Sequence, residues 1–167
     1  MSERTTTTAL GLGANQGHCR ETLRRTVDAL SGVVDGLRVG GLYRSAPEAG
    51  GPQPDYWNTA VVGRTRLAPE ELLAFGKALE RAAGRRPGPR NAPRPLDIDL
   101  LVWGELVRDA PELTLPHPRL ARRAFVLAPL ADAAGELRIP PDGRTVAELL
   151  ATVDRGSLRR VRWRPEG

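Results

Sequence analysis

The sequence has few cysteines, histidines and aromatic residues, and these shortages exclude several classes of protein. Among its 167 residues are one cysteine, Cys19, and two histidines, so neither an internal disulfide framework nor a Cys-rich or His-rich metal cluster can form. No run approaches the ~18 consecutive apolar residues of a transmembrane helix. The first residues, MSERTTTTALGLGA, lack the basic and then apolar segments of a secretory signal. We therefore expect a cytoplasmic protein that has no membrane partner.

Positive charge is plentiful but unevenly distributed. The net charge is +5, a balance that often accompanies nucleic-acid binding. Outside two arginine clusters, however, the chain has 15 basic and 20 acidic residues. The charge is therefore local, which argues against a nucleic-acid partner, and we interpret the second cluster as a solvated tail. The clusters are Arg81, Arg85, Arg86, Arg90 and Arg94, and then Arg155, Arg159, Arg160, Arg162 and Arg164.

The hydrophobic pattern predicts one α+β domain over residues 1–167. The order is strand–helix–strand twice over, which is typical of a ferredoxin-like antiparallel sheet with two main helices on one face, here followed by C-terminal additions. We expect the core over about residues 9–150 and a tail of unknown role over 151–167. The predicted strands are 5–12, 37–43, 57–65 and 96–103, and the predicted helices are 19–30, 68–83, 124–134 and 146–152.

Two acidic residues open the last predicted strand of the core. Asp97 and Asp99 are two apart, so on a strand their carboxylates share a face and repel each other unless a cation lies between them. Mg²⁺ favours one or two carboxylates together with phosphate oxygens. The Pro-rich, arginine-rich loop before them could hold those phosphates. Alternatively, the two acids are solvated at a strand edge or paired with nearby arginines.

Three further side chains are candidates for ligand contacts. His117 lies between two prolines, which fix the backbone on both sides, and it could contact phosphate or serve as a structural loop residue. Tyr56 and Asn58 share one face of a predicted strand. A ring beside an amide suits a flat heterocycle, since the ring can stack and the amide can read its edge. A core aromatic beside a capping amide is the alternative.

Glycines at positions 11, 13 and 17 predict a turn after the first strand. The segment is not a phosphate-binding P-loop, because the Lys-Ser/Thr pair of that motif is absent. We expect Asn15 instead to orient the neighbouring loops.

Five segments, in this order and spacing, resemble the family of 6-hydroxymethyl-7,8-dihydropterin pyrophosphokinases of folate biosynthesis. The most specific is the Pro-Arg-x-Leu-Asp-hydrophobic-Asp segment, and the resemblance runs over about residues 9–150. The segments are LGAN (12–15), YRSAP (43–47), PDYWN (54–58), PRPLDID (93–99) and LPHP (115–118). Three positions depart from the family pattern: Asn91 replaces a frequent Trp, Pro118 a frequent Tyr, and Glu48 an apolar residue.

The resemblance implies a Mg²⁺-dependent transfer of pyrophosphate from ATP to the hydroxymethyl group of the pterin, with release of AMP, by a monomer. By matching positions, Asp97 and Asp99 hold two Mg²⁺ ions. The residues implied to bind the pterin are Ser45, Ala46, Tyr56, Asn58 and Phe125. Those implied to bind ATP are Lys77, Glu80, Arg94, His117 and Arg123, while Arg85 and Arg86 close over the triphosphate and, with Arg94, assist transfer.

Two rival interpretations remain. An RNA-binding ferredoxin-like module would use exposed aromatics of an RNP-like segment, and the sequence has no such segment. The second rival is a relative that binds nucleotide but is inactive.

Overall fold

The computed structural model describes residues 4–47, 52–86, 88 and 93–165, and its centre is a six-stranded antiparallel sheet. The strand order is β10-β3-β4-β1-β5, and β2 pairs with β4 beside this path. These strands are β1 (Thr6–Ala14), β2 (Val34–Val39), β3 (Leu42–Ser45), β4 (Tyr56–Thr65), β5 (Asp97–Trp103) and β10 (Arg159–Val161). Two small hairpins are formed by β6 (Arg108–Ala110) with β7 (Leu113–Leu115) and by β8 (Arg138–Ile139) with β9 (Arg144–Thr145).

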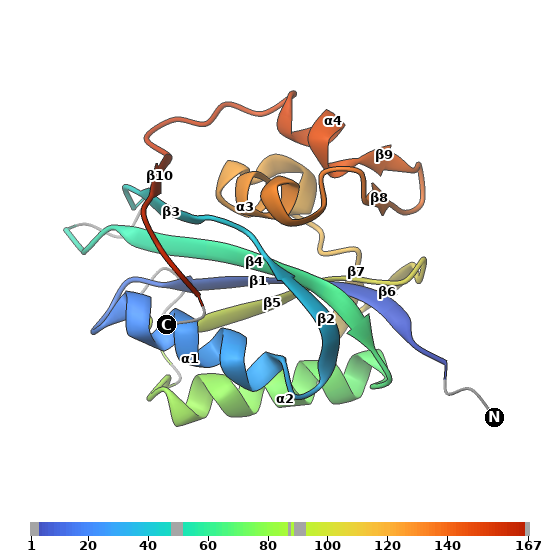
Figure 1. The fold of residues 1–167 in the computed structure, drawn as a ribbon, viewed down its shortest axis with the longest axis horizontal. Helices are drawn as coiled ribbons and strands as arrows, with labels where there is room; N and C mark the ends of the chain where they lie inside the picture. The colour runs from blue at the N-terminus through green and yellow to red at the C-terminus, as the bar shows by residue number, and fades with distance from the viewer. Residues whose placement is uncertain (1–3, 48–51, 87, 89–92, 166–167) are drawn as a thin grey trace.

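Helices cover both faces of the sheet. Figure 1 shows α1 (Cys19–Leu30) and α2 (Pro69–Ala82) on one face, with α3 (Ala124–Ala134) and α4 (Val146–Leu150) on the other. A short 3-10 turn, η1 (Leu120–Arg122), precedes α3. The predicted ferredoxin-like arrangement, with two main helices on one face and C-terminal additions, is confirmed. In the part of the chain that the structure describes, none of the helices has the length and apolar character needed to span a membrane.

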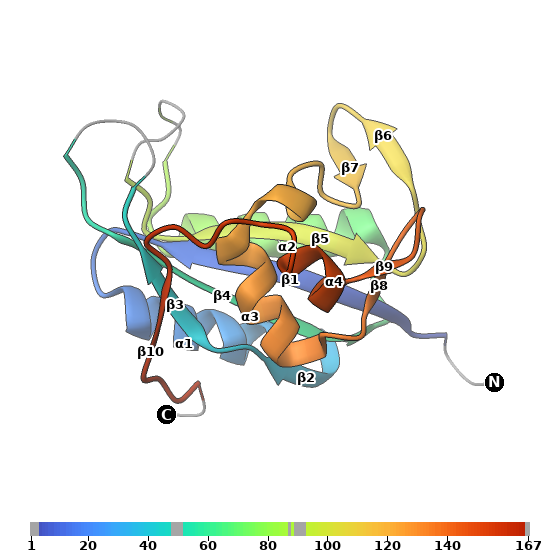
Figure 2. The same cartoon turned by 90° about the horizontal axis from the view of Figure 1, so that it is seen from above.

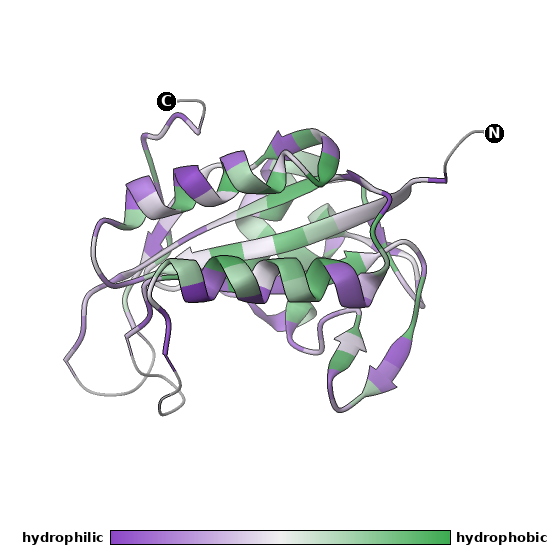
Figure 3. Cartoon of the chain, turned by 90° about the horizontal axis from the view of Figure 1, so that it is seen from below, coloured by the Kyte–Doolittle hydropathy of each residue, from purple (hydrophilic) through white to green (hydrophobic). Residues whose placement is uncertain are grey.

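The helices form where the local sequence favours them. In α1 the buried residues Cys19, Leu23, Val27 and Leu30 recur every three or four positions and so make one apolar face. In α2, Pro69 fits the first turn, where its missing N–H would have no intrahelical partner. Hydrophilic and hydrophobic segments alternate along both helices, as Figure 3 shows.

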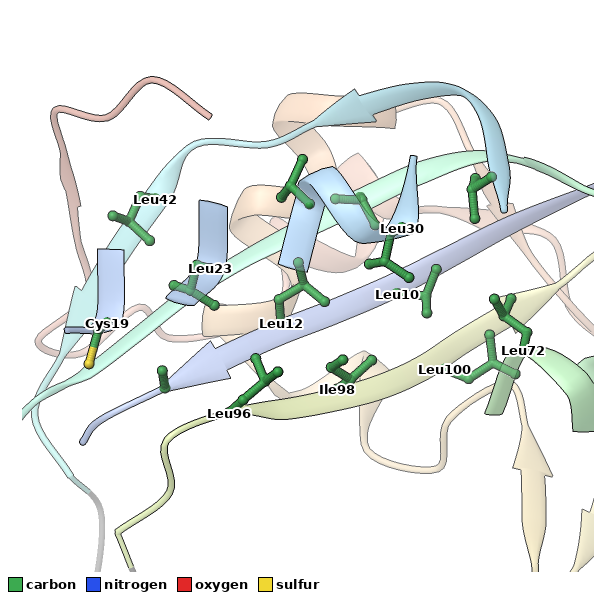
Figure 4. Close-up of a cluster of buried hydrophobic side chains, with 14 of the residues drawn as sticks. Leu10, Leu12, Cys19, Leu23, Leu30, Leu42, Leu72, Leu96, Ile98 and Leu100 are labelled. Carbon is green, nitrogen blue, oxygen red and sulfur yellow. The ribbon is translucent and has the colours of Figure 1, made fainter. Parts of the chain in front are cut away.

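Two hydrophobic clusters flank the sheet. The larger one packs α1 and α2 against strand residues that include Leu10, Leu12 and Ile98 (Figure 4). The second packs α3 and α4 against the opposite face of the strands and includes Leu101 and Leu127. Because side chains alternate along a strand, Ile98 of β5 belongs to the first cluster and Leu101 to the second. Both faces of the sheet are therefore buried over much of their length.

The predicted strand 37–43 is wrong in its bounds, because the chain breaks into two strands there. β2 ends at Val39 and β3 begins at Leu42. The break follows from close packing: a Cβ on Gly40 would lie 2.0 Å from the carbonyl oxygen of Pro129 in α3. The helix backbone therefore rests against Gly40, where no side chain fits.

Two other expectations are also corrected. Gly11 and Gly13 lie within β1 and not in a turn, and only Gly17, with φ of 77°, has the left-handed conformation of one. The second arginine cluster is solvated as expected, since all five of its arginines are exposed, but it is not a free tail, because β10 within it pairs with β3 at the edge of the sheet. Figures 1 and 2 both show this strand beside β3.

Candidate active site

The register of the sheet places the predicted site residues in one row across four strands. Gly13 of β1 is paired with Asp97 of β5 on one side and with Asn58 of β4 on the other. Asn58 is in turn paired with Tyr43 of β3. Neighbouring strands are about 4.8 Å apart, so Asp97 and Asn58 stand roughly 10 Å from each other. This row lies on the α3 side of the sheet.

A cavity of about 870 Å³ lies over this row, a volume typical of small-molecule sites. Tyr56 and Asn58 line it from β4, whereas carboxylates, arginines and a histidine gather around β5. The Phe125 ring lies beside these charged groups, with its centroid 5.4 Å from the Arg123 guanidinium carbon. Predicted site residues that line it are Ser45, Ala46, Tyr56, Asn58, Arg85, Arg94, Asp97, Asp99, His117, Arg123 and Phe125. Segments from six different parts of the sequence therefore converge on one cavity.

Three predicted residues do not line the cavity as the structure describes it: Lys77, Glu80 and Arg86. Lys77 is exposed on α2, which packs against the opposite face of the sheet, and Arg86 is exposed in the loop that follows. Glu80 lies behind the site, where its Oε2 accepts hydrogen bonds from the Ile98 N–H and from Arg85, both at 2.7 Å. Glu80 is thus placed to support the start of β5 and Arg85.

The two carboxylates of β5 each face cationic groups. Asp97 Oδ1 accepts hydrogen bonds from Arg85 at 2.7 Å and from Arg94 at 3.5 Å. Asp99 has more distant neighbours, with His117 Nε2 at 3.8 Å and an Arg123 nitrogen at 3.9 Å. The arginine pairing that the sequence left open for the two acids therefore occurs at Asp97.

Burial and charge perturb the ionisation of this end of the cavity. Burial, reinforced by the negative charge of Asp97, raises the pKa of Asp99 from 3.8 to about 7. Burial, together with the positive charge of Arg123, lowers the pKa of His117. Burial also lowers the pKa of the Arg85 guanidinium, but Asp97 and Glu80 outweigh it and the net shift is upward. Arg123, although it acts to lower the pKa of Asp99, does not outweigh burial and the charge of Asp97.

These features fit a divalent cation. Asp97 and Asp99 offer hard oxygen donors from one face of β5, and the raised pKa of Asp99 is the response of a buried carboxyl beside another negative charge. Within the described ranges, no group of three or more His, Cys, Asp and Glu side chains could hold a metal. A cation bound here would have two carboxylate ligands and would be completed by water and substrate oxygens, which is the usual situation of protein-bound Mg²⁺.

The other end of the cavity suits a flat, polar heterocycle. Tyr56 and Asn58 come from the start of β4 and Phe125 from the first turn of α3, and all three line the cavity. Asn58 is 9% exposed. Its amide faces the cavity, where a ligand can reach it. An almost buried amide that faces a cavity is able to read the edge of a ligand.

Asn15 fixes the loops at the mouth of the site, as the sequence predicted. Its side chain is buried, at 1% exposure. The amide nitrogen donates to Gln53 Oε1 at 2.7 Å and to the Pro54 carbonyl at 3.3 Å, while the amide oxygen accepts from the Arg94 N–H at 2.8 Å. One side chain thus joins the loop before β4 to the loop before β5.

Sequence reasoning missed part of the cavity wall. Arg119 lines its charged side beside Arg122, which the sequence does offer as a phosphate donor after His117, and the segment 154–158 lines it from the C-terminal part of the chain. The arginines lie close after His117 in the sequence, which was a usable signal. Nothing local to residues 154–158 indicates a site, because only the pairing of β10 brings them there. The predicted positions Asn91 and Glu48, and Arg90 of the first arginine cluster, lie outside the described residues.

Comparison with known proteins identifies the family. The model of the 7,8-dihydro-6-hydroxymethylpterin-pyrophosphokinase (HPPK) family matches residues 9–135. The chain belongs to this family. It is 39% identical over 154 residues to a 2-amino-4-hydroxy-6-hydroxymethyldihydropteridine pyrophosphokinase of Pseudomonas aeruginosa, covering 91% of this chain and 94% of that one. A protein of the same name from Methylorubrum extorquens is 40% identical over 156 residues, covering 91% and 96%. The chain is thus an enzyme of the pyrophosphokinase class.

Solved structures confirm the HPPK fold independently of close sequence similarity. The wild-type HPPK-DHPS of Plasmodium falciparum, solved with pteroate, superposes with a TM-score of 0.70 at 13% identity. The superposition covers 90% of this chain but 45% of the Plasmodium chain, so the present chain spans less than half of that protein. The likeness at this identity concerns the fold alone.

Proposed function

We propose that this HPPK transfers pyrophosphate from ATP to the hydroxymethyl group of 6-hydroxymethyl-7,8-dihydropterin, giving AMP and the pterin diphosphate, with two Mg²⁺ ions bound at Asp97 and Asp99. The observation that carries the proposal is the two-ended cavity. It joins the Tyr56 ring and Asn58 amide of β4 to the carboxylates and arginines around β5, with Asn58 and Asp97 roughly 10 Å apart across two strand spacings. That arrangement suits an acceptor ring at one end and a triphosphate at the other.

The acceptor end would hold and orient the pterin. Tyr56 and Phe125 would stack on the two faces of the ring, which is favourable for aromatic groups. The Asn58 amide would read the edge of the ring, and the backbone of Ser45 and Ala46 would add contacts from the neighbouring strand end. Orientation of this kind converts a bimolecular encounter into an intramolecular one.

The charged end would hold the triphosphate and stabilise charge as it moves. Arg94, His117 and Arg123 would donate to phosphate oxygens, and Arg85 stands within hydrogen-bond distance of Asp97 at the same end. Bound Mg²⁺ would supply neutralisation of phosphate charge and polarisation of the transferred group. The pterin hydroxyl would attack the β-phosphorus in line while AMP leaves. We assign no general base and no covalent intermediate.

Product analysis tests the proposal directly. Purified protein is incubated with ATP, Mg²⁺ and 6-hydroxymethyl-7,8-dihydropterin, and the nucleotides and pterins are then separated. We expect AMP and diphosphorylated pterin in equal amounts. Formation of ADP, or no turnover, would refute the proposed reaction.

Substitution of the carboxylates tests the metal assignment. Asp97→Asn and Asp99→Asn should each lower kcat at least about a thousandfold, since several kcal/mol of charge stabilisation are lost. The folded state should persist, because both side chains are partly exposed. The matched control is Asp109→Asn, an acid-to-amide change at an exposed position of β6 away from the cavity, which should keep wild-type kcat. Near-normal activity of either site variant would overturn the assignment.

A further inference from the structure

The chain beyond α4 returns to the cavity. Residues 154–158 line it, and β10 follows immediately and pairs with β3, with Arg159 opposite Arg44 and Val161 opposite Leu42. Figure 2 shows this C-terminal segment running from α4 to the sheet edge beside β3. The family match ends at residue 135, so it assigns nothing to this part of the chain.

The cavity-lining turn has a defined conformation. Asp154 Oδ1 accepts a hydrogen bond from the Gly156 N–H at 2.8 Å, and the Leu158 N–H donates to the Arg155 carbonyl at 2.9 Å. Gly156 has φ of 52°, a left-handed conformation that glycine adopts without steric cost. The turn therefore presents the next residue, Ser157, in a fixed place.

Ser157 contacts the acceptor end of the cavity. Its Oγ accepts a hydrogen bond from the Ala46 N–H at 3.0 Å, across 111 positions of sequence. Ser45 is the last residue of β3 and pairs with Tyr56, so Ala46 is the first residue beyond the sheet. The N–H of Ala46 has no hydrogen-bond acceptor in the neighbouring strand, and the Ser157 hydroxyl serves as its acceptor instead.

A second set of contacts ties the same two strands to α3. Arg160 of β10 lies 3.7 Å from Asp132. Asp132 Oδ2 also accepts hydrogen bonds from the Tyr43 hydroxyl at 2.9 Å and from the Gly41 N–H at 3.1 Å. The strand that follows Ser157 and the strand that precedes Ala46 are therefore held to one carboxylate on α3, the helix that supplies Phe125.

We propose that Ser157 is a positioning residue for the pterin site: it holds the segment from Ser45 to Pro47 in the conformation that contacts the pterin. The inference rests on the proposed function, because it specifies which part of the chain shapes the acceptor end. Without the hydroxyl, the Ala46 N–H forms a hydrogen bond with water instead, and residues 45–47 become ordered only when the pterin binds. The cost of that ordering reduces pterin affinity and leaves the phosphate end unchanged.

The test compares Ser157→Ala with Ser157→Thr, which keeps a hydroxyl. For Ser157→Ala we expect the KM for the pterin to rise about 3- to 10-fold, the effect of one hydrogen bond. The kcat and the KM for ATP should stay within twofold of wild type, and Ser157→Thr should restore the KM for the pterin. Hydrogen exchange gives a readout without turnover: protection of the Ala46 amide should be lost in Ser157→Ala and kept in Ser157→Thr. The matched control, Ser31→Ala, removes a hydroxyl at the end of α1 and should change neither quantity.

The outcomes separate this inference from the proposed function. If wild-type protein forms no pterin diphosphate, the proposed function fails and this inference fails with it. If wild type is active but Ser157→Ala keeps both the KM for the pterin and the Ala46 protection, this inference alone is overturned. A fall in kcat and a rise in both KM values, with a lowered melting temperature, would also overturn it, since that pattern indicates general loss of structure.

Discussion

Replacement of Gly13 by alanine should displace the Asn58 amide, because the added Cβ would overlap with it. Gly13 lies in β1 between Asn58 and Asp97. A Cβ at this position would lie 2.6 Å from Asn58 Oδ1, where ordinary van der Waals contact begins at 3.4 Å. The Asn58 amide is the far end of its side chain and lines the cavity, so it can relieve the contact only by moving toward the space that the pterin would occupy. The amide oxygen must move by about 0.8 Å, the difference between those two distances.

The size of the effect follows from this overlap. Overpacking a buried site destabilises the folded state by about 1 to 3 kcal/mol. Replacing a strand glycine by alanine stabilises it by about 0.5 to 1 kcal/mol, because glycine loses more backbone entropy on folding. We therefore expect Gly13→Ala to lower the free energy of unfolding by about 0 to 2.5 kcal/mol. Displacing the Asn58 amide forfeits one or two hydrogen bonds to the pterin, which should lower kcat/KM for the pterin roughly 10- to 100-fold.

Gly11→Ala provides the matched control in the same strand and on the same face. A Cβ there would lie 3.7 Å from the nearest side-chain atoms of Leu101, an ordinary contact. We expect this variant to be unchanged in activity and equal to wild type or slightly higher in stability. Urea unfolding and steady-state kinetics with varied pterin measure both quantities. Wild-type kcat/KM in Gly13→Ala, or an equal loss in Gly11→Ala, would refute the reasoning.

Two further predictions concern Asp99 and Asn15. Because the folded chain raises the pKa of Asp99 from 3.8 to about 7, it binds this proton more tightly than the unfolded chain, and metal-free wild type should lose stability as pH rises from about 4 to about 7. In EDTA, Asp99→Asn should then exceed wild type in unfolding free energy by up to about 4 kcal/mol at pH 8 and come close to it near pH 4. A gap independent of pH would contradict the assigned pKa. Asn15→Ala removes three hydrogen bonds that join the two loops. It should lower the unfolding free energy by about 2 to 4 kcal/mol and raise the KM for both substrates. Wild-type stability in urea unfolding would contradict the role of Asn15.

The sequence alone predicts the elements whose signals are local. The bounds of α1 and α3 match the expected ranges 19–30 and 124–134, since apolar periodicity and nearby glycines or prolines act within a few residues. The pair Asp97 and Asp99 is likewise a local pattern, and alternation along a strand puts both on one face. The five family segments identified the HPPK family, which the comparisons confirm.

Only the tertiary structure decides the features that depend on distant parts of the chain. The break between β2 and β3 arises because α3, some ninety residues later, rests its backbone on Gly40. Gly13 matters because the register places Asn58 beside it. The three-residue strand β10 has no strong pattern of its own and exists because β3 offers a free edge, which in turn brings Ser157 to Ala46. Hydrophobic periodicity reports which face of an element is buried, whereas contact across more than a hundred residues is set by how the faces pack together.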